Sequence, residues 1–328
     1  PNKQRMEEYP QLTQMWKSPN GTIRSILDGT VFRAPILIDS IHPVVKNWKK
    51  PITIARHAYG DVYKSVDMYT TEPGECTMTF RGESGEEKTL LVQKVDGTIV
   101  ECNTAYGGGR ASTENHLKAA ADHGFTAIAP VDIMDAEGET ALPVEGGRHL
   151  AEDYVGKNFL NYDFTVVLSH FKGHAMGGFG GAIKNISIGI ASSAGKAWIH
   201  SAGKTKNAAQ MWGNLPAQDD FLESMAEAAK SVADHCGEKI LYINVMNNLS
   251  VDCDAHPAAP EMGDIGILAS TDPVALDKAC VDLVYASDDP GKVHLIERIE
   301  SRHGTHTLDH AAAIGLGDPD YELIDIDN

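Results

Sequence analysis

The alternation of strand-like and helix-like segments from about Gly97 onward is the feature that most restricts the fold of this 328-residue chain. Short apolar runs bounded by Gly, Pro or charged residues predict strands, and longer stretches that end in glycine predict helices. Strands that alternate with helices are typical of an α/β domain with a largely parallel sheet. The expected strands are 98–100, 126–129, 165–168, 240–245 and 265–268, and the expected helices are 112–123, 219–236 and one that begins at Asp272-Pro273.

The first third of the chain has a different character. It carries two short apolar runs, 34–38 and 51–55, which we interpret as strands. Residues 1–93 hold 12 Lys+Arg against 11 Asp+Glu, whereas the remainder holds 16 against 35. The charge balance therefore changes near residues 91–94, and a chain of this length is expected to form about two domains.

Composition excludes several classes of function. The net charge is −18 and no Lys/Arg cluster stands out, so we expect no nucleic-acid partner. No apolar run approaches the roughly 18 residues of a membrane span, so we expect no membrane insertion. The five cysteines are odd in number, widely spaced and without a Cys-x-x-Cys pair, which argues against a disulfide framework or an iron–sulfur cluster. A reducing, cytoplasmic location is the prediction.

Arginines concentrate beside turns in the first 64 residues. Arg24, Arg33 and Arg56 accompany a Ser-Pro-Asn-Gly turn at 18–21. Guanidinium groups bind carboxylates in a bidentate geometry, so this combination predicts a pocket for a polycarboxylate. Surface arginines without a ligand are the alternative.

A glycine-rich segment follows the predicted strand 165–168. Backbone N–H groups of such a turn can approach an anion closely, and the carboxyl ends of strands are where α/β sheets bind ligands. We expect Lys184 to neutralise a bound anion, and His170 or His174 to act as a ligand or general base. A purely structural turn is the alternative. The glycines expected to hold the anion are Gly177, Gly178, Gly180 and Gly181.

A third cluster follows the predicted strand 240–245. It combines two carboxylates, a thiol and an imidazole, a mixture that suits a divalent transition metal such as zinc or iron. A solvated loop is the alternative. Because parallel strands end at one edge of a sheet, we expect this loop and segment 169–184 to converge on one site. The expected metal ligands are Asp252, Cys253, Asp254 and His256.

Other histidines fall into two groups. Lys196 and His200 lie downstream of the glycine-rich segment and are candidates to close the same site. His303, His306 and His310 have no carboxylate or thiol pattern beside them, so we expect exposed helix and loop residues there.

Residues 1–93 resemble the NADP-dependent isocitrate dehydrogenases in segments 17–24, 29–35 and 55–64. The resemblance implies that five residues bind the carboxylates of isocitrate. It also implies that Tyr63 assists acid–base chemistry. The family's catalytic lysine and metal-binding aspartates have no counterpart after Lys94. NADP and Mg²⁺ or Mn²⁺ therefore belong only to the alternative in which the chain oxidises isocitrate. The implied carboxylate-binding residues are Ser18, Asn20, Arg24, Arg33 and Arg56.

Residues 94–328 resemble the family catalogued as domain of unknown function 362. Many members carry a pair of ferredoxin motifs where this chain has residues 207–214, so we expect no iron–sulfur cluster here. The predicted function is binding of a metal ion or a small anion, with isocitrate oxidation or a non-catalytic binding module as alternatives. Whether the chain is an enzyme and how it oligomerises stay open. The resemblance rests on segments 102–110, 116–125, 169–185, 252–256 and 270–277.

The two resemblances meet near residues 91–94 without a polar linker. Natural fusions join complete domains through linkers, so an assembly junction or a deliberate chimera is the expectation, with an evolved fusion as the alternative. The predicted organisation is a partial isocitrate/isopropylmalate dehydrogenase-like segment, 1–93, followed by an α/β domain, 94–328.

Overall fold

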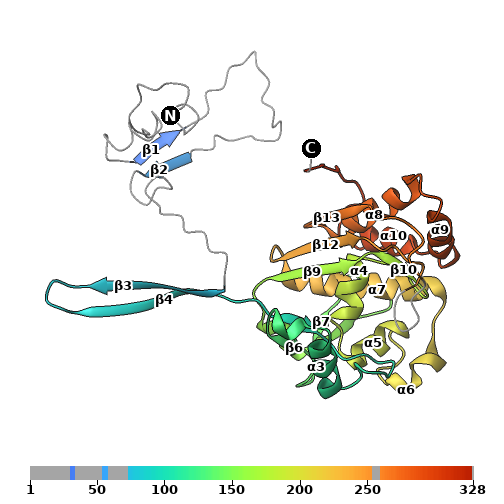
Figure 1. Cartoon of the computed structure of the whole chain (residues 1–328), viewed down its shortest axis with the longest axis horizontal. Helices are drawn as coiled ribbons and strands as arrows, with labels where there is room; N and C mark the ends of the chain where they lie inside the picture. Colours follow the sequence, from blue (N-terminus) through green and yellow to red (C-terminus); the bar gives the residue numbers. More distant parts are fainter. Residues whose placement is uncertain (1–29, 34–53, 58–72, 253–258, 327–328) are drawn as a thin grey trace, which may run out of the picture. The chain divides into compact units, whose positions relative to one another are not determined.

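The computed structural model describes residues 30–33, 54–57, 73–252 and 259–326, which belong to two compact units, Pro1–Val95 and Asp96–Asn328 (Figure 1). In the first unit, β1 (Thr30–Arg33) pairs antiparallel with β2 (Ile54–His57). Strand β2 overlaps the expected strand 51–55, whereas the expected strand 34–38 lies outside the described residues.

A two-stranded hairpin completes the described part of the first unit. Strands β3 (Gly74–Arg81) and β4 (Glu87–Val95) pair antiparallel around a turn in which Gly82 N donates to Glu86 O over 2.7 Å. Gly85 adopts φ +87°, a conformation that glycine reaches without a steric penalty. Met78, Phe80 and Leu90 are exposed along the hairpin.

The second unit is built on a three-stranded sheet in the order β13-β12-β9. Strands β9 (Thr165–His170) and β12 (Ile240–Met246) are parallel, and β13 (Gly266–Ser270) joins β12 antiparallel. The α/β class is therefore confirmed, with parallel and antiparallel pairings side by side. The other strand pairs are β5 (Ile99–Glu101) with β6 (Val131–Ile133), which are parallel, and the antiparallel pairs β7 (Glu139–Pro143) with β8 (Glu152–Gly156) and β10 (Lys172–His174) with β11 (Gly178–Gly180).

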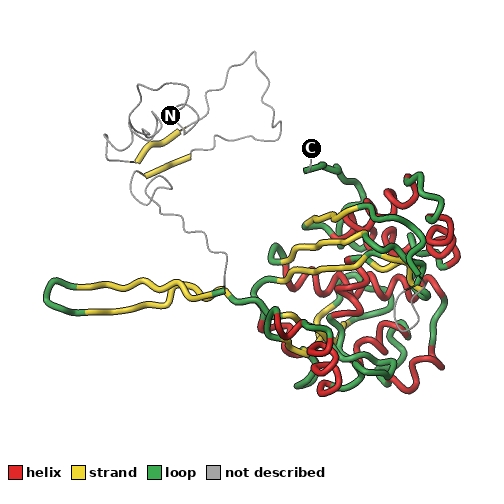
Figure 2. The backbone as a smooth tube through the Cα atoms, in the orientation of Figure 1, coloured by secondary structure: helices red, strands yellow, loops and turns green. Residues whose placement is uncertain are grey.

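Helices pack against the strands of the second unit, and Figure 2 distinguishes helices from strands by colour. The predicted helices 112–123 and 219–236 appear within two residues at either end, because capping and glycine stop signals are local. The helices are α3 (Thr113–Asp122), α4 (Ala182–Lys184), α5 (Ser193–His200), α6 (Ala208–Met211), α7 (Gln218–Cys236), α8 (Pro273–Ala286), α9 (Lys292–Ser301) and α10 (His306–Ala313).

Four shorter helical turns fill the connections. The expected strand 126–129 is wrong, because Phe125–Ala127 forms a 3₁₀ turn after Gly124 at φ +84°, and the strand begins only at Val131. A four-residue apolar run carries too little periodicity to separate the two states. The remaining turns are Lys157–Asn161, Trp212–Asn214 and the π-helical Asn185–Gly189.

The core lies on one face of the three-stranded sheet. Residues of β12 alternate between buried and half-buried, as the two-residue period of a strand requires. Tyr242 and Met246 on the buried face belong to the same apolar cluster as Ala226 and Ala229 of α7. The edge strands leave apolar side chains exposed, namely Val166, Leu168 and Ile267.

Candidate functional site

Most of the isocitrate-type residues fall outside the part of the chain that the structure describes. Arg33 and Arg56 are the exceptions: the β1–β2 register pairs Arg56 with Val31 and Arg33 with Ile54. The two arginine positions therefore lie diagonally across one strand pair. Outside the described residues lie Ser18, Asn20, Arg24 and Tyr63.

The predicted histidines sit on β9 and β10 and are held by backbone groups. Nε2 of His170 lies 2.6 Å from the carbonyl oxygen of Asn247, to which it donates. Nδ1 of His174 accepts from Gly177 N at 2.9 Å and from Met176 N at 3.3 Å. Each imidazole thus fixes the path of a neighbouring loop.

The glycine-rich turn is packed against the protein itself. A Cβ on Gly181 would lie 2.3 Å from Oδ1 of Asp277, and one on Gly178 would lie 2.8 Å from the Cα of Gly304. The carboxylate of Asp277 accepts from Ala182 N at 2.7 Å and from Ile183 N at 3.0 Å. The two N–H groups that follow the turn therefore already bind an anion, the side chain of Asp277. Gly177 and Gly180 make looser contacts, with Phe179 O and the Lys184 side chain.

The segment that leads into the third predicted cluster lies beside β10. Gly173 N donates to Ser250 O at 2.8 Å, so the segment after β9 and the segment after β12 are adjacent, as expected for the ends of parallel strands. The carboxylate of Asp252 receives both guanidinium nitrogens of Arg298, at 2.6 and 3.1 Å. Cys253, Asp254 and His256 lie outside the described residues.

Lys184 belongs to a second group of polar residues, at the carboxyl ends of β5 and β6. Its positive charge acts on Glu101, the last residue of β5, together with the charges of Lys196 and Arg110. Desolvation by the surrounding protein nevertheless raises the pKa of the Glu101 carboxyl above its usual range. Glu101 is itself exposed to solvent, so its carboxyl is accessible from outside the protein.

Lys196 is the central cation of this group. It lies on α5, is 3% exposed, and donates from Nζ to the carbonyl oxygen of Ala191 at 2.6 Å. Burial lowers the pKa of its ammonium group, whereas the nearby carboxylates of Asp135 and Glu101 act in the opposite direction. Among the described residues, no carboxylate lies within ion-pair distance of Nζ.

Asp135 ties the end of β6 to the surrounding elements. Its oxygens accept from Asn103 N at 2.9 Å and from Ser193 N, the first residue of α5, at 3.1 Å. A carboxylate at a helix N-terminus is favourable because unpaired N–H groups point toward it. This contact fixes α5, and Lys196 with it, against the carboxyl ends of β5 and β6.

His200, one turn after Lys196, extends the group to the loop after β5. Its Nδ1 faces the Lys196 carbonyl oxygen at 2.7 Å and must carry the proton, so Nε2 accepts from the Tyr106 hydroxyl at 3.3 Å. Burial lowers the pKa of His200 to about 4, which keeps the imidazole neutral at physiological pH. Tyr106 is thereby held against α5.

The loop between β5 and α3, which includes Tyr106, contains three consecutive glycines, Gly107 to Gly109. Gly107 and Gly108 adopt φ +81°, and no atom lies within 4 Å of a Cβ built on either residue or on Gly109. This loop therefore has open space around its backbone. Two buried polar atoms nearby, Oδ1 of Asn103 and Nδ1 of His116, have no hydrogen-bond partner in the described part of the chain.

Cys102 is the one thiol in this group, and it is not poised as a nucleophile. Burial raises its pKa to about 12, and its Sγ donates to the Ile190 carbonyl oxygen at 3.2 Å. A thiol is nucleophilic only as the thiolate, so Cys102 stays inert near neutral pH. The chemistry available here is ion pairing and proton transfer by Lys196 and Glu101.

The glycines of the loop after β5 are not among those predicted to bind an anion, which lie in the turn at 177–181. The signal for the β5 site was present, because Tyr106-Gly-Gly-Gly-Arg110 follows the predicted strand 98–100 and precedes a predicted helix. The same rule that singled out 177–181 applies to it. The contacts that fill one turn and leave the other open are long-range.

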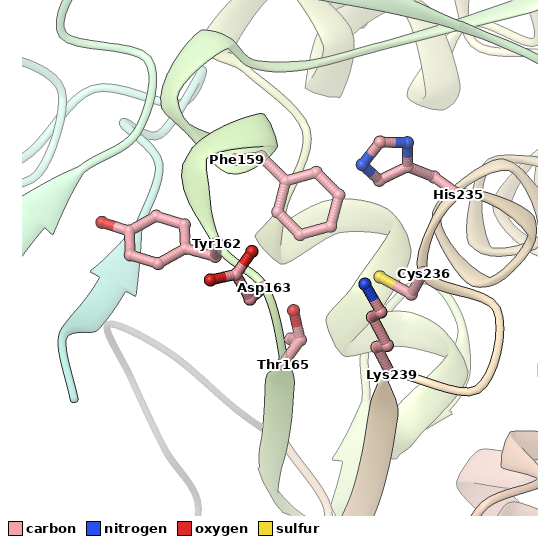
Figure 3. Close-up of a pocket in the computed structure, with 7 residues that line it drawn as sticks. All are labelled: Phe159, Tyr162, Asp163, Thr165, His235, Cys236 and Lys239. Atoms are coloured by element: carbon pink, nitrogen blue, oxygen red, sulfur yellow. The ribbon is translucent and has the colours of Figure 1, made fainter. Parts of the chain in front are cut away.

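Figure 3 shows a separate pocket of about 200 Å³, in which the Phe159 ring points toward His235 and Lys239 lies beside Cys236. It lies at the amino-terminal end of β9, at Thr165. Ligands of α/β sheets bind at the carboxyl ends of strands, and ligand pockets typically exceed about 300 Å³. We therefore place the candidate site at β5 and β6 instead.

None of the described helices has both the length and the apolar character needed to cross a bilayer.

One part of the chain is similar to known enzymes. It is 51% identical over 89 residues to the cytosolic isocitrate dehydrogenase (NADP) of Arabidopsis thaliana, and 53% identical over 85 residues to the cytoplasmic isocitrate dehydrogenase (NADP) of Saccharomyces cerevisiae. These matches cover 27% and 26% of this chain but only 22% and 20% of the two relatives. The chain thus spans about a fifth of the length of these relatives.

The larger part matches a family of proteins without an assigned function. The match covers residues 75–282, which include all but the first residue of the hairpin β3–β4, the loop after β5, the glycine-rich turn and the first ten residues of α8. It includes every residue of the β5 site described above. The chain therefore belongs to the family described as domain of unknown function (DUF362).

Proposed function

We propose that the unit Asp96–Asn328 binds a small molecule carrying a carboxylate or phosphate group at the carboxyl ends of β5 and β6. The observation that carries the proposal is Lys196, a buried ammonium group that donates a hydrogen bond to a backbone carbonyl. A buried charge without a direct ion pair is unfavourable, so such a group is often completed by a ligand, even where carboxylates such as Asp135 and Glu101 lie nearby.

The charges around Lys196 favour an anion. Lys184, Lys196 and Arg110 act on Glu101, and Glu101 and Asp135 are the acidic members of the group. His116, like His200, is kept neutral because burial lowers its pKa. The site is therefore locally cationic in a chain whose net charge is −18.

The open loop at Gly107–Gly109 supports the same function. Glycine backbone without neighbouring atoms lets N–H groups approach a bound oxyanion. Lys196 would contact the anion, Arg110 would lie at its entrance, and Glu101, with its raised pKa, would supply or accept a proton. Lysine with a lowered pKa is also a typical general base, so a catalytic function of this site is consistent with the same geometry.

Titration of the full chain with inorganic phosphate and with malonate, followed by isothermal calorimetry, tests this proposal. We expect saturable binding that Lys196→Met weakens about 10–100-fold, since a hydrogen bond to a charged group contributes roughly 1.5–3 kcal/mol. Methionine preserves the length of the buried side chain and should leave the fold intact. Lys118→Met, an exposed lysine paired with Asp122, is the matched control.

Equal affinity in Lys196→Met and Lys118→Met would contradict the assignment. If neither probe binds wild type, the site does not recognise a free oxyanion and the proposal fails. Arg110→Met provides an independent variant at the entrance of the same site.

The isocitrate-type segment leads to a separate prediction. We expect no isocitrate oxidation by this chain, because the residues after Lys94 belong to the second family and supply no counterpart of the catalytic lysine and metal-binding aspartates. Hydride transfer requires those groups to align cofactor, metal ion and substrate. NADPH formation with isocitrate and Mn²⁺, followed by absorbance, is the measurement. If the wild-type chain formed NADPH and Arg56→Ala abolished that activity, this expectation would be wrong.

Two finer hypotheses stay predictions. Metal binding by Asp252, Cys253, Asp254 and His256 is one, and of these residues only Asp252 lies in the described part of the chain. We also propose a reducing, cytoplasmic location, which the free thiols of Cys76, Cys102 and Cys280 support.

A further inference from the structure

A cluster of histidines and carboxylates lies between α7 and α10. Asp219, Glu223 and Glu227 are spaced four residues apart and so share one face of the helix. His306 and His310, also four residues apart, face them from α10, and His303 precedes α10. The expectation that His306 and His310 are exposed is therefore wrong, because their partners are carboxylates more than 80 residues away.

The inner end of this cluster is structural. Glu227 is fully buried and accepts from the backbone N–H groups of Arg148, His149 and Leu150 at 2.7, 3.0 and 2.8 Å. Nε2 of His310 donates to the same carboxylate at 3.1 Å. Four donors satisfy Glu227, so it has no capacity left for a ligand ion.

The outer end is different. Nδ1 of His303 lies 2.8 Å from Oδ1 of Asp219, and the rings of His303 and His306 stack with their centroids 5.0 Å apart. One potential ligand atom from each of Asp219, His303 and His306 lies within 4.8 Å of the others. His303 and Asp219 are accessible to solvent, so an ion can reach them.

We propose that Asp219, His303 and His306 form a binding site for a divalent transition metal ion, with Zn²⁺ as the best match. Two imidazoles and one carboxylate form a set of ligands typical of zinc sites that keep a fourth position open for water or substrate. Nitrogen ligands select against Mg²⁺ and Ca²⁺, which prefer oxygen.

The geometry needs only a small adjustment. Ligand atoms about 2.0–2.2 Å from a tetrahedral zinc ion lie roughly 3.3–3.6 Å from one another. The hydrogen-bonded pair His303 Nδ1 and Asp219 Oδ1, now 2.8 Å apart, must therefore open slightly, and any pair near the 4.8 Å limit must close by an ångström or so. Rotation of the exposed Asp219 and His303 side chains supplies such a movement without a change in the helices.

Neighbouring residues favour this assignment. Glu223 accepts from Nε2 of His306 at 3.0 Å and from Nε2 of His149 at 2.7 Å, and carboxylates that hold a histidine in this way orient it for metal binding. Charge also favours a dication, because four carboxylates face a single guanidinium group. The charged residues of this cluster are Asp219, Asp220, Glu223, Glu227 and Arg148.

Titration of the metal-free full chain with Zn²⁺ against a chromophoric chelator tests the site. We expect one high-affinity Zn²⁺ per chain, and at least a tenfold loss of affinity in Asp219→Asn and in His303→Asn. Asparagine suits position 303 because the backbone there has φ +51°, which Asn tolerates better than most residues. Glu223→Gln should weaken binding about 10–100-fold through its effect on His306.

His294→Asn is the matched control, because His294 also pairs with a carboxylate, Glu261, on the surface. Its zinc affinity should equal that of wild type. Wild-type affinity in His303→Asn, or displacement of Zn²⁺ by equimolar Mg²⁺, would overturn the proposal. Lys196→Met should bind Zn²⁺ normally, so failure of the anion site and failure of the metal site are distinguishable.

Discussion

Replacing Gly173 with alanine is expected to destabilise the second unit by about 3 kcal/mol or more. A Cβ at this position would lie 1.9 Å from the carbonyl oxygen of Val251 and 2.5 Å from its carbonyl carbon. Both are backbone atoms, so no side-chain rotation relieves the overlap. The hydrogen bond from Gly173 N to Ser250 O, 2.8 Å long, would lengthen or break as the two segments separate.

Thermal unfolding followed by circular dichroism measures this effect. For a unit of this size, 3 kcal/mol corresponds to a fall in Tm of roughly 6–12 °C. Gly109→Ala is the control, because no atom lies within 4 Å of its Cβ and its φ is not positive. Equal Tm values for the two variants would show that the loops after β9 and β12 are not in contact.

The elements that sequence predicts well are those with local signals. Helix α8 begins where Asp272 and Pro273 place it, and Oδ1 of Asp272 accepts from Val274 N and Ala275 N at 2.8 and 3.0 Å. These contacts involve neighbours in the chain, so residue identities alone indicate them. Strand β12 is also marked locally, because its sequence is a nearly continuous run of apolar residues.

Hairpins and sites depend on partners that lie far away in the sequence. The hairpin β3–β4 is marked only by the short apolar run at 90–92, and the described side chains of both strands are exposed or half-buried rather than part of the core. The sequence predicts a role for Lys184 beside the glycines, and Gly180 does lie next to its side chain, but the sequence does not indicate that the charge of Lys184 also acts on Glu101 and His200. Such pairings are fixed by how strands and helices pack, which short motifs do not encode.

Asp277 carries the second large prediction. Its carboxylate is completely buried and accepts from Ala182 N, Ile183 N and Asn244 Nδ2 at 2.7, 3.0 and 2.7 Å. Asp277→Leu would leave three buried donors without an acceptor, and each costs about 1–3 kcal/mol, so a loss of 3–5 kcal/mol is expected. Asp277→Asn keeps one acceptor oxygen but turns an amide N–H₂ toward Ile183 N. This variant should therefore lose less stability than Asp277→Leu, about 1–3 kcal/mol.

The pH dependence of stability separates the charge of Asp277 from its hydrogen bonds. Burial raises the pKa of this carboxyl to about 6 from the ordinary 3.8, so its ionised form is disfavoured in the folded state. Wild type should therefore lose stability relative to Asp277→Asn as the pH rises from about 4 to about 6, by up to about 3 kcal/mol. Denaturant unfolding of both proteins between pH 4 and pH 7.5 measures this difference.

Asp153, also buried and with its pKa raised to about 7, titrates in both proteins, so its contribution cancels in the comparison. A stability difference that does not change with pH would mean that Asp277 ionises as readily in the folded chain as in the unfolded one, and that hydrogen bonds from α4 and Asn244 fully compensate its burial.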